Sequence, residues 1–217
     1  MSGDLEPGGP VLYHPPMIPA RLTSLSLAAV GWRFDGPPPE EDRYVCLAVP
    51  HTSNWDGLLL VAMAHSVGLE MRWMIKDTWF RGPMGPALRR LGAIAIDRDR
   101  SRNVVSQMVD ELQRRDRLIL VIPPEGTRGR ADHWKSGFYH IARQADVPVV
   151  PGYLDYGRRR CGLGSPIHLT GDVRADMDRI RAFYQAGGYT GRVPANMSPI
   201  RLREEEAAAP VTTASRR

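Results

Sequence analysis

The chain has 217 residues, enough for one domain with a continuous apolar core. Its 29 Lys and Arg exceed its 24 Asp and Glu by five, a small excess that favours anionic partners but is no nucleic-acid signature. The apolar (42%) and charged (24%) fractions are ordinary and exclude global disorder, and two cysteines are too few for a disulfide scaffold.

Residues 1–43 are predicted to be an N-terminal segment outside the main domain. Pro and Gly are frequent in its first 16 residues, whereas Met17 to Trp32 spaces apolar residues as an amphipathic helix does. Such a helix packs on a core more often than it lies on a bilayer. The segment has no secretory signal pattern, and no apolar run of the chain is long enough to span a membrane. We therefore expect a cytoplasmic protein that reaches the inner membrane only from its surface.

Residues 44–190 alternate short apolar runs with helical patterns, which is typical of an α/β domain with a mostly parallel central sheet flanked by helices. The predicted strands are 44–49, 71–75, 93–97, 117–122, 147–153 and 166–169, and the predicted helices are 56–67, 78–90, 101–115, 136–145 and 174–186. Residues 191–217 are predicted to be a C-terminal extension that is disordered from about Arg203. Ligands of such sheets bind beyond the carboxyl ends of the strands, so we expect chemistry in loops 50–57 and 123–130.

The first of these loops contains His51, and Asp56 follows five positions later. On one continuous helix two such residues point about 140° apart, so they share a site only if His51 stays on the loop and the helix starts at or just before Asp56. A carboxylate beside one imidazole nitrogen fixes the tautomer and leaves the other nitrogen to accept a proton. The alternative is structural: Asp56 caps the helix and His51 has no chemical role.

The second loop contains Glu125-Gly126-Thr127-Arg128 at the exit of a predicted buried strand. Gly126 allows the backbone to approach a ligand, and the planar guanidinium of Arg128 matches the geometry of a phosphate. The alternative is an ordinary turn with a surface arginine.

Together the two loops resemble those of the glycerophosphate acyltransferase family, and of its lysophosphatidic acid acyltransferase branch in particular. His51 and Asp56 match the catalytic His-x4-Asp motif of that family. Three further motifs follow in the family's order, namely the stretch from Lys76 to Arg98, Pro124 to Arg128, and Val147 to Gly152. The resemblance covers about Tyr44 to Tyr156.

This resemblance implies that His51 is the general base and that Asp56 orients it. The residues it implies for substrate binding are Lys76, Arg98, Glu125, Gly126, Thr127 and Arg128. The implied donor is an acyl thioester of coenzyme A or acyl carrier protein. The implied acceptor is a phosphate-bearing alcohol such as 1-acyl-glycerol-3-phosphate, and no cofactor or metal is needed. Two other functions stay open: a non-catalytic module that binds anionic membranes, and a metal-dependent phosphoesterase, for which the sequence has no convincing His/Asp cluster.

Overall fold

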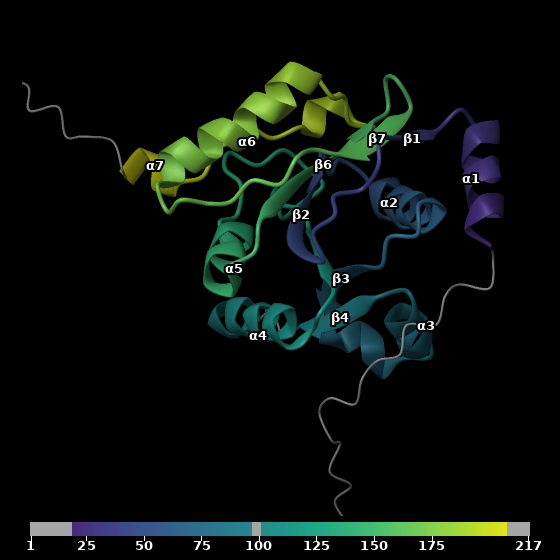
Figure 1. Ribbon diagram of the computed structural model, residues 1–217, viewed down its shortest axis with the longest axis horizontal. Helices are drawn as coiled ribbons and strands as arrows, with labels where there is room; N and C mark the ends of the chain where they lie inside the picture. The colour runs from purple at the N-terminus through teal and green to yellow at the C-terminus, as the bar shows by residue number, and fades with distance from the viewer. Residues whose placement is uncertain (1–18, 97–100, 208–217) are drawn as a thin grey trace, which may run out of the picture.

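The computed structural model describes residues 19–96 and 101–207. Its centre is a sheet of seven strands in the order β1-β7-β6-β2-β5-β3-β4, with helices on both faces (Figure 1). Each neighbouring pair is parallel except β6 and β7, which form an antiparallel hairpin. The prediction of an α/β fold with a mostly parallel sheet is confirmed.

The strands are β1 (Arg33–Asp35), β2 (Arg43–Val49), β3 (Met71–Lys76), β4 (Ala93–Ile96), β5 (Leu118–Ile122), β6 (Val149–Asp155) and β7 (Arg160–Leu163). The α-helices are α1 (Ala20–Ala29), α2 (Asn54–Ser66), α3 (Gly85–Arg90), α4 (Ser101–Arg114), α5 (Gly137–Ala145), α6 (Val173–Gly187) and α7 (Glu204–Ala207). Two 3-10 helices, η1 (Asp77–Arg81) and η2 (Pro194–Asn196), complete the described elements.

Strand β2 lies at the centre of the sheet, between β5 and β6, and is buried on both faces. Because successive side chains of a strand point to opposite faces, Val45 and Leu47 join one core and Tyr44 and Cys46 join another. The first core includes residues of α4, α5 and α6, and the second packs under α2. This double burial fixes the exit of β2, where the His51 loop begins.

Two predicted elements of the main domain differ from the structure, and two short strands were not predicted. Residues 166–169 form no strand and contribute only a single bridge between Val149 and Ile167, because Pro166 lacks a backbone donor for a ladder. Strand β1, at the edge of the sheet, and its neighbour β7 escaped prediction because they are short and carry charged residues or glycine. The predicted helix 78–90 is divided into η1 and α3 at Gly82-Pro83, where proline interrupts helical hydrogen bonding.

The N-terminal helix is shorter than predicted and packs only loosely. Helix α1 contacts α2, yet none of its residues is buried, and Leu22 and Leu25 are exposed. No described helix combines the length and the apolar character that a bilayer crossing requires. At the other end, Glu204–Ala207 form helix α7 where disorder was expected, and residues 208–217 lie outside the described part of the chain.

Candidate active site

The site lies where three neighbouring parallel strands end at the same edge of the sheet. Strand β2 runs beside β5, with Leu47 opposite Ile122, and beside β6, with Val49 opposite Tyr153. The residues that follow these strands therefore meet, as expected for the carboxyl ends of parallel strands. They include His51 after β2, Glu125 after β5 and Tyr156 after β6.

The His51 loop ends in a tightly hydrogen-bonded helix start. Helix α2 begins at Asn54, so His51 stays on the loop, and Ser53 is the N-cap. Oδ2 of Asp56 accepts the backbone N–H groups of Thr52 (2.6 Å) and Ser53 (2.8 Å), and Oδ1 accepts the Ser53 hydroxyl (2.9 Å). Asp56 is only 2% exposed. The structural role considered from the sequence is thus present: Asp56 caps α2.

The same carboxylate also faces the imidazole. His51 Nδ1 lies 3.7 Å from Asp56 Oδ2, within ion-pair range but longer than a hydrogen bond. Burial lowers the pKa of His51, Asp56 counteracts that effect, and Arg128 adds to it. A neutral imidazole is therefore favoured near neutral pH, and with Nδ1 turned toward Asp56 its other nitrogen, Nε2, is left for a substrate.

Glu125 links the second loop to the first. Its side chain is 1% exposed, Oε1 accepts the backbone N–H of His51 at 3.0 Å, and Oε2 accepts the Ser198 hydroxyl at 3.4 Å. Burial raises the pKa of Glu125 to about 7, although both hydrogen bonds lower it and Asp56 raises it further. Next in the chain, Gly126 has φ +69°, and a Cβ there would lie 2.9 Å from Lys135 Cγ. Only glycine fits this position without strain.

Arg128 makes a second link between the loops. Its exposed guanidinium donates a hydrogen bond to Oδ1 of Asn54, the first residue of α2. Thr127, also exposed, accepts the Gly129 backbone N–H through its hydroxyl at 3.2 Å and so shapes the turn. The structure thus gathers His51, Asp56 and Arg128 around the start of α2.

Of the other two residues implied for substrate binding, only Lys76 belongs to the described part of the chain. Lys76 is exposed at the end of β3, which β5 separates from β2. Within the described part of the chain, no hydrogen bond or ion pair joins Lys76 to either loop. Arg98 lies outside the described residues, two positions after the end of β4 at Ile96.

Sequence reasoning missed Tyr156. Its hydroxyl donates a hydrogen bond to Asp56 Oδ1 at 2.8 Å across a separation of 100 residues. The sequence shows a tyrosine directly after an apolar strand, but this indicates a site residue only if β6 is known to lie beside β2. Strand order was not derivable from the sequence pattern.

Sequence reasoning also missed residues 193–198, which follow α6 and form hydrogen bonds with both site loops. Thr52 accepts the Val193 backbone N–H through Oγ1 at 3.2 Å and the Asn196 side-chain N–H through its carbonyl at 3.4 Å. Ser198 accepts the Ala131 N–H at 3.0 Å and donates to Glu125. The composition of residues 193–198 did not indicate this contact, because the segment resembles an ordinary polar loop.

The residue just before this segment is an arginine at the rim of the site. The Arg192 guanidinium lies 5.5 Å from the ring centroid of Trp55 and 5.9 Å from that of Tyr156. Both distances are in the range of cation–π attraction.

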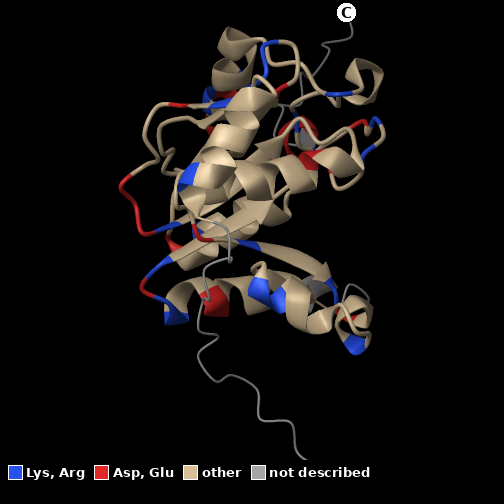
Figure 2. Cartoon of the chain, turned by 90° about the vertical axis from the view of Figure 1, so that its right-hand side faces the viewer, with Lys and Arg blue, Asp and Glu red and all other residues tan. Residues whose placement is uncertain are grey.

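Elsewhere on the surface, basic and acidic residues are interspersed on the side shown in Figure 2, as expected for solvated charges.

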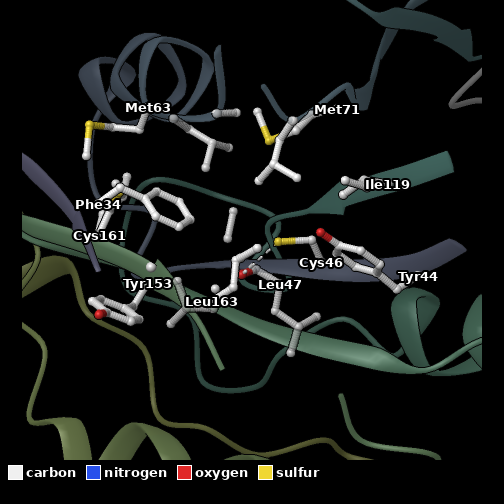
Figure 3. A pocket seen from close by; sticks show the side chains of 18 residues that line it. Phe34, Tyr44, Cys46, Leu47, Met63, Met71, Ile119, Tyr153, Cys161 and Leu163 are labelled. Carbon is white, nitrogen blue, oxygen red and sulfur yellow. Dashed lines mark hydrogen bonds between the residues drawn. The ribbon is translucent and has the colours of Figure 1, made fainter. Parts of the chain in front are cut away.

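An apolar cavity lies between α2 and the sheet (Figure 3). Its volume is about 30 Å³, room for roughly one or two water molecules. Met63 and Met71 line this cavity, Met74 packs against the larger core, and Met84 is exposed. In this conformation the cavity is too small for an acyl chain.

Metal-binding side chains are not gathered in the described residues. Between residues 19 and 96 and between 101 and 207, no three His, Cys, Asp or Glu side chains are arranged to hold an ion.

The chain is similar in sequence to a known protein family and to individual proteins of known name. The family model described as Acyltransferase matches residues 35–155, more than half of the chain. The chain is 31% identical to sheep 1-acyl-sn-glycerol-3-phosphate acyltransferase alpha over 66% of its own length and 57% of that protein. It is 34% identical to the human beta form over 56% of its own length and 46% of that protein. The chain thus spans only about half the length of the curated relatives it matches.

A solved structure shares the fold. The crystal structure of 1-acyl-sn-glycerophosphate acyltransferase from Thermotoga maritima superimposes with a TM-score of 0.57 at 14% identity, covering 77% of this chain and 76% of the other. At that identity the match concerns the fold. The sequence match over residues 35–155 establishes more, and by it the chain belongs to the acyltransferase family.

Proposed function

We propose that this protein transfers an acyl group from a thioester of coenzyme A or acyl carrier protein to a hydroxyl of a phosphate-bearing acceptor such as 1-acyl-glycerol-3-phosphate. The observation that carries the proposal is the arrangement around the start of α2. A buried carboxylate faces Nδ1 of His51, and Arg128 is tethered to Asn54 in the adjoining helical turn. Membership of the acyltransferase family and relatives named for this acceptor support it.

In the proposed reaction, Nε2 of His51 removes the proton of the acceptor hydroxyl as its oxygen attacks the thioester carbonyl. The C–O bond forms, the C–S bond breaks, and the imidazolium returns the proton to the leaving thiolate. Asp56 stabilises the imidazolium while it exists, as the carboxylate of a catalytic triad does. No protein nucleophile is needed, because the substrate supplies it.

The charge that develops on the thioester oxygen needs a hydrogen-bond donor. In loop residues 51–56, which are all described, the backbone N–H groups of His51, Thr52, Ser53, Trp55 and Asp56 already have acceptors. The N–H of Asn54 has none there and stands at the positive end of the α2 dipole. It is the donor that we assign to the oxyanion.

Arg128 is assigned to the acceptor phosphate. It is exposed, and a planar guanidinium pairs with phosphate through charge-assisted hydrogen bonds about twice as strong as neutral ones. Binding the phosphate requires Arg128 to share or exchange its bond to Asn54. Lys76, exposed at the end of β3, is a further candidate for this or the donor phosphate, as is Arg98 by the family resemblance.

The decisive experiment measures thiol release and product mass with acyl-CoA and acyl carrier protein donors, using acceptors with and without phosphate. His51→Ala should lose about 10²- to 10⁴-fold in turnover, the range for a general base. His140→Ala, an exposed histidine on α5, is the matched control and should keep full activity. Full turnover by the His51 variant would remove the proposed base.

The same assays separate the alternatives. Phosphate release that is abolished by a chelator would indicate the metal-dependent phosphoesterase. Vesicle binding with no transfer from any donor would indicate the non-catalytic membrane module.

Because the proposed acceptor is a membrane lipid, contact with the cytoplasmic surface of the inner membrane is part of the proposed function. Its support is α1, which has no buried residue and exposes Leu22 and Leu25. Replacing both leucines with Gln should weaken sedimentation with anionic vesicles. Leu91→Gln, an exposed leucine after α3, is the control. Equal sedimentation of the two variants would refute a contact through α1.

A further inference from the structure

Tyr156 is fixed on two sides beside the first turn of α2. The ring of Trp32 meets it edge to face, with centroids 5.0 Å apart, and the Arg192 guanidinium lies 5.9 Å from its centroid. With the ring fixed, the direction of its hydroxyl is fixed as well. That hydroxyl donates to Asp56 Oδ1 at 2.8 Å.

The four donors to Asp56 do not have equal roles. Three of them belong to Thr52 and Ser53, in the same turn as the carboxylate, so they close the helix cap wherever that turn lies. Tyr156 comes from the far end of β6 and ties the carboxylate to the sheet. Burial raises the pKa of Tyr156 to about 12, so its phenol stays protonated and serves as a donor to the carboxylate.

We infer that Tyr156 is a positioning residue, whose hydroxyl holds the Asp56 carboxylate in the orientation that faces His51. This inference rests on the proposed function, in which His51 is the base. Tyr156 lies beyond the residues matched by the family model, which end at 155. Without its hydroxyl, Oδ1 keeps one donor, Ser53, and the carboxylate loses the hydrogen bond that ties it to the end of β6.

Losing this donor also changes the charge that His51 senses. A hydrogen bond to a carboxylate spreads its negative charge, so removing the bond leaves more of that charge to stabilise an imidazolium. The pKa of His51 should therefore rise. The other charged groups nearby are Arg128, which acts on His51, Glu125, which is coupled to Asp56, and Arg192, which acts on Tyr156, and the substitution alters none of them.

The test compares Tyr156→Phe with Tyr139→Phe. Tyr139 is a matched control because its hydroxyl also donates to a carboxylate, Asp176, at 2.7 Å, and burial raises its pKa to about 12 too. Tyr139 and Asp176 lie on α5 and α6, away from both site loops. Each variant loses one tyrosine–aspartate hydrogen bond, so a purely structural role predicts similar losses of Tm and unchanged turnover for both.

For Tyr156→Phe we expect kcat to fall about tenfold with unchanged KM values, since a misplaced base slows chemistry more than binding. The acid limb of its kcat–pH profile should move to higher pH. Tyr139→Phe should keep the wild-type kcat and profile. Wild-type kcat and profile in Tyr156→Phe, or equal changes in both variants, would overturn the inference.

A second readout needs no activity. The imidazole signal of His51 is followed by NMR as pH is varied, and His51→Asn assigns it. The His51 pKa should rise in Tyr156→Phe and stay at the wild-type value in Tyr139→Phe; an unchanged pKa in both variants would overturn the inference. If the wild type transfers no acyl group, the proposed function fails, whereas this titration still decides whether Tyr156 acts on the His51–Asp56 pair.

Discussion

Glu125 accepts a hydrogen bond from the backbone N–H of His51 at 3.0 Å, so its side chain joins the second loop to the main chain of His51 and not to the imidazole. The ring of His51 therefore stays free to face Asp56 on one side and a substrate on the other. The bond also fixes where the loop leaves β2. A buried carboxyl whose pKa is about 7 makes this connection sensitive to pH.

Glu125→Gln should remove a pH dependence of stability. The folded-state pKa of about 7 exceeds the ordinary 4.5, so between these values the folded state binds more protons than the unfolded state. The free energy of unfolding then falls as pH rises from about 5 to 8, by at most about 3 kcal/mol. Urea unfolding at a series of pH values should show this slope in the wild type and not in the variant. Parallel slopes would contradict the assignment.

Asp56→Asn should lose both stability and turnover. A neutral amide would replace the hydrogen bonds to a charged carboxylate by weaker neutral ones and force the Ser53 and Tyr156 hydroxyls to turn and accept, which costs about 1–3 kcal/mol. The imidazolium would lose its counter-charge, so kcat should fall by about 10³-fold. Asp172→Ala is the control: Asp172 caps α6 by accepting from Arg174 and Ala175, and its loss costs about 1 kcal/mol. If the Asp172 variant lost as much turnover as Asp56→Asn, stability and not chemistry would explain both.

Arg128→Lys should raise the KM for a phosphorylated acceptor about tenfold, because an ammonium group cannot reproduce the planar fork of a guanidinium. The KM for an acceptor without phosphate should not change. Arg130→Lys, two residues along the same loop, is the comparison, since Arg130 is exposed and bonds the Met197 carbonyl. Unaltered kinetics of Arg128→Lys with phosphorylated acceptors would exclude Arg128 as the phosphate contact.

Gly126→Ala should destabilise the second loop. A side chain at φ +69° costs about 1–2 kcal/mol, and the new Cβ would press on Lys135 Cγ. Gly129→Ala is the control, because its Cβ would meet no atom closer than 3.9 Å. Thermal unfolding should show a lower Tm for Gly126→Ala and nearly the wild-type value for Gly129→Ala. A Tm loss shared by both would point to a general intolerance of the loop.

The sequence was most informative where its pattern repeats over many residues. Apolar runs separated by helical spacing predicted the parallel sheet and most helices, because each buried strand must be apolar on both faces. The two loops could be singled out for the same reason, since strands that run in one direction end at one edge. Short elements were not predicted. Strands β1 and β7 have three and four residues, and they form because they pair with neighbouring strands, which the local sequence pattern does not indicate.

Within the site, the residues of the two motif-bearing loops could be predicted from the sequence, but the residues that hydrogen-bond to them from other parts of the chain could not. The spacing of His51 and Asp56 allowed a shared site only if His51 stayed on a loop before the helix start, and the structure has this arrangement. Whether Asp56 caps the helix or faces the imidazole looked like a choice, yet its two oxygens allow both. Tyr156 and Ser198 lie at the site because of the strand order and the path of the chain after α6, and neither can be inferred from local composition.

The crossing of the two loops by residues 193–198 has a practical consequence for comparing relatives and for shortening the chain. The family match ends at residue 155, so an alignment confined to it leaves out the partners of Thr52 and Glu125. Differences between relatives in this later stretch can alter the two site loops without touching any motif. An expression fragment meant to keep the site intact should extend through Leu202, which is 1% exposed and belongs to the larger core.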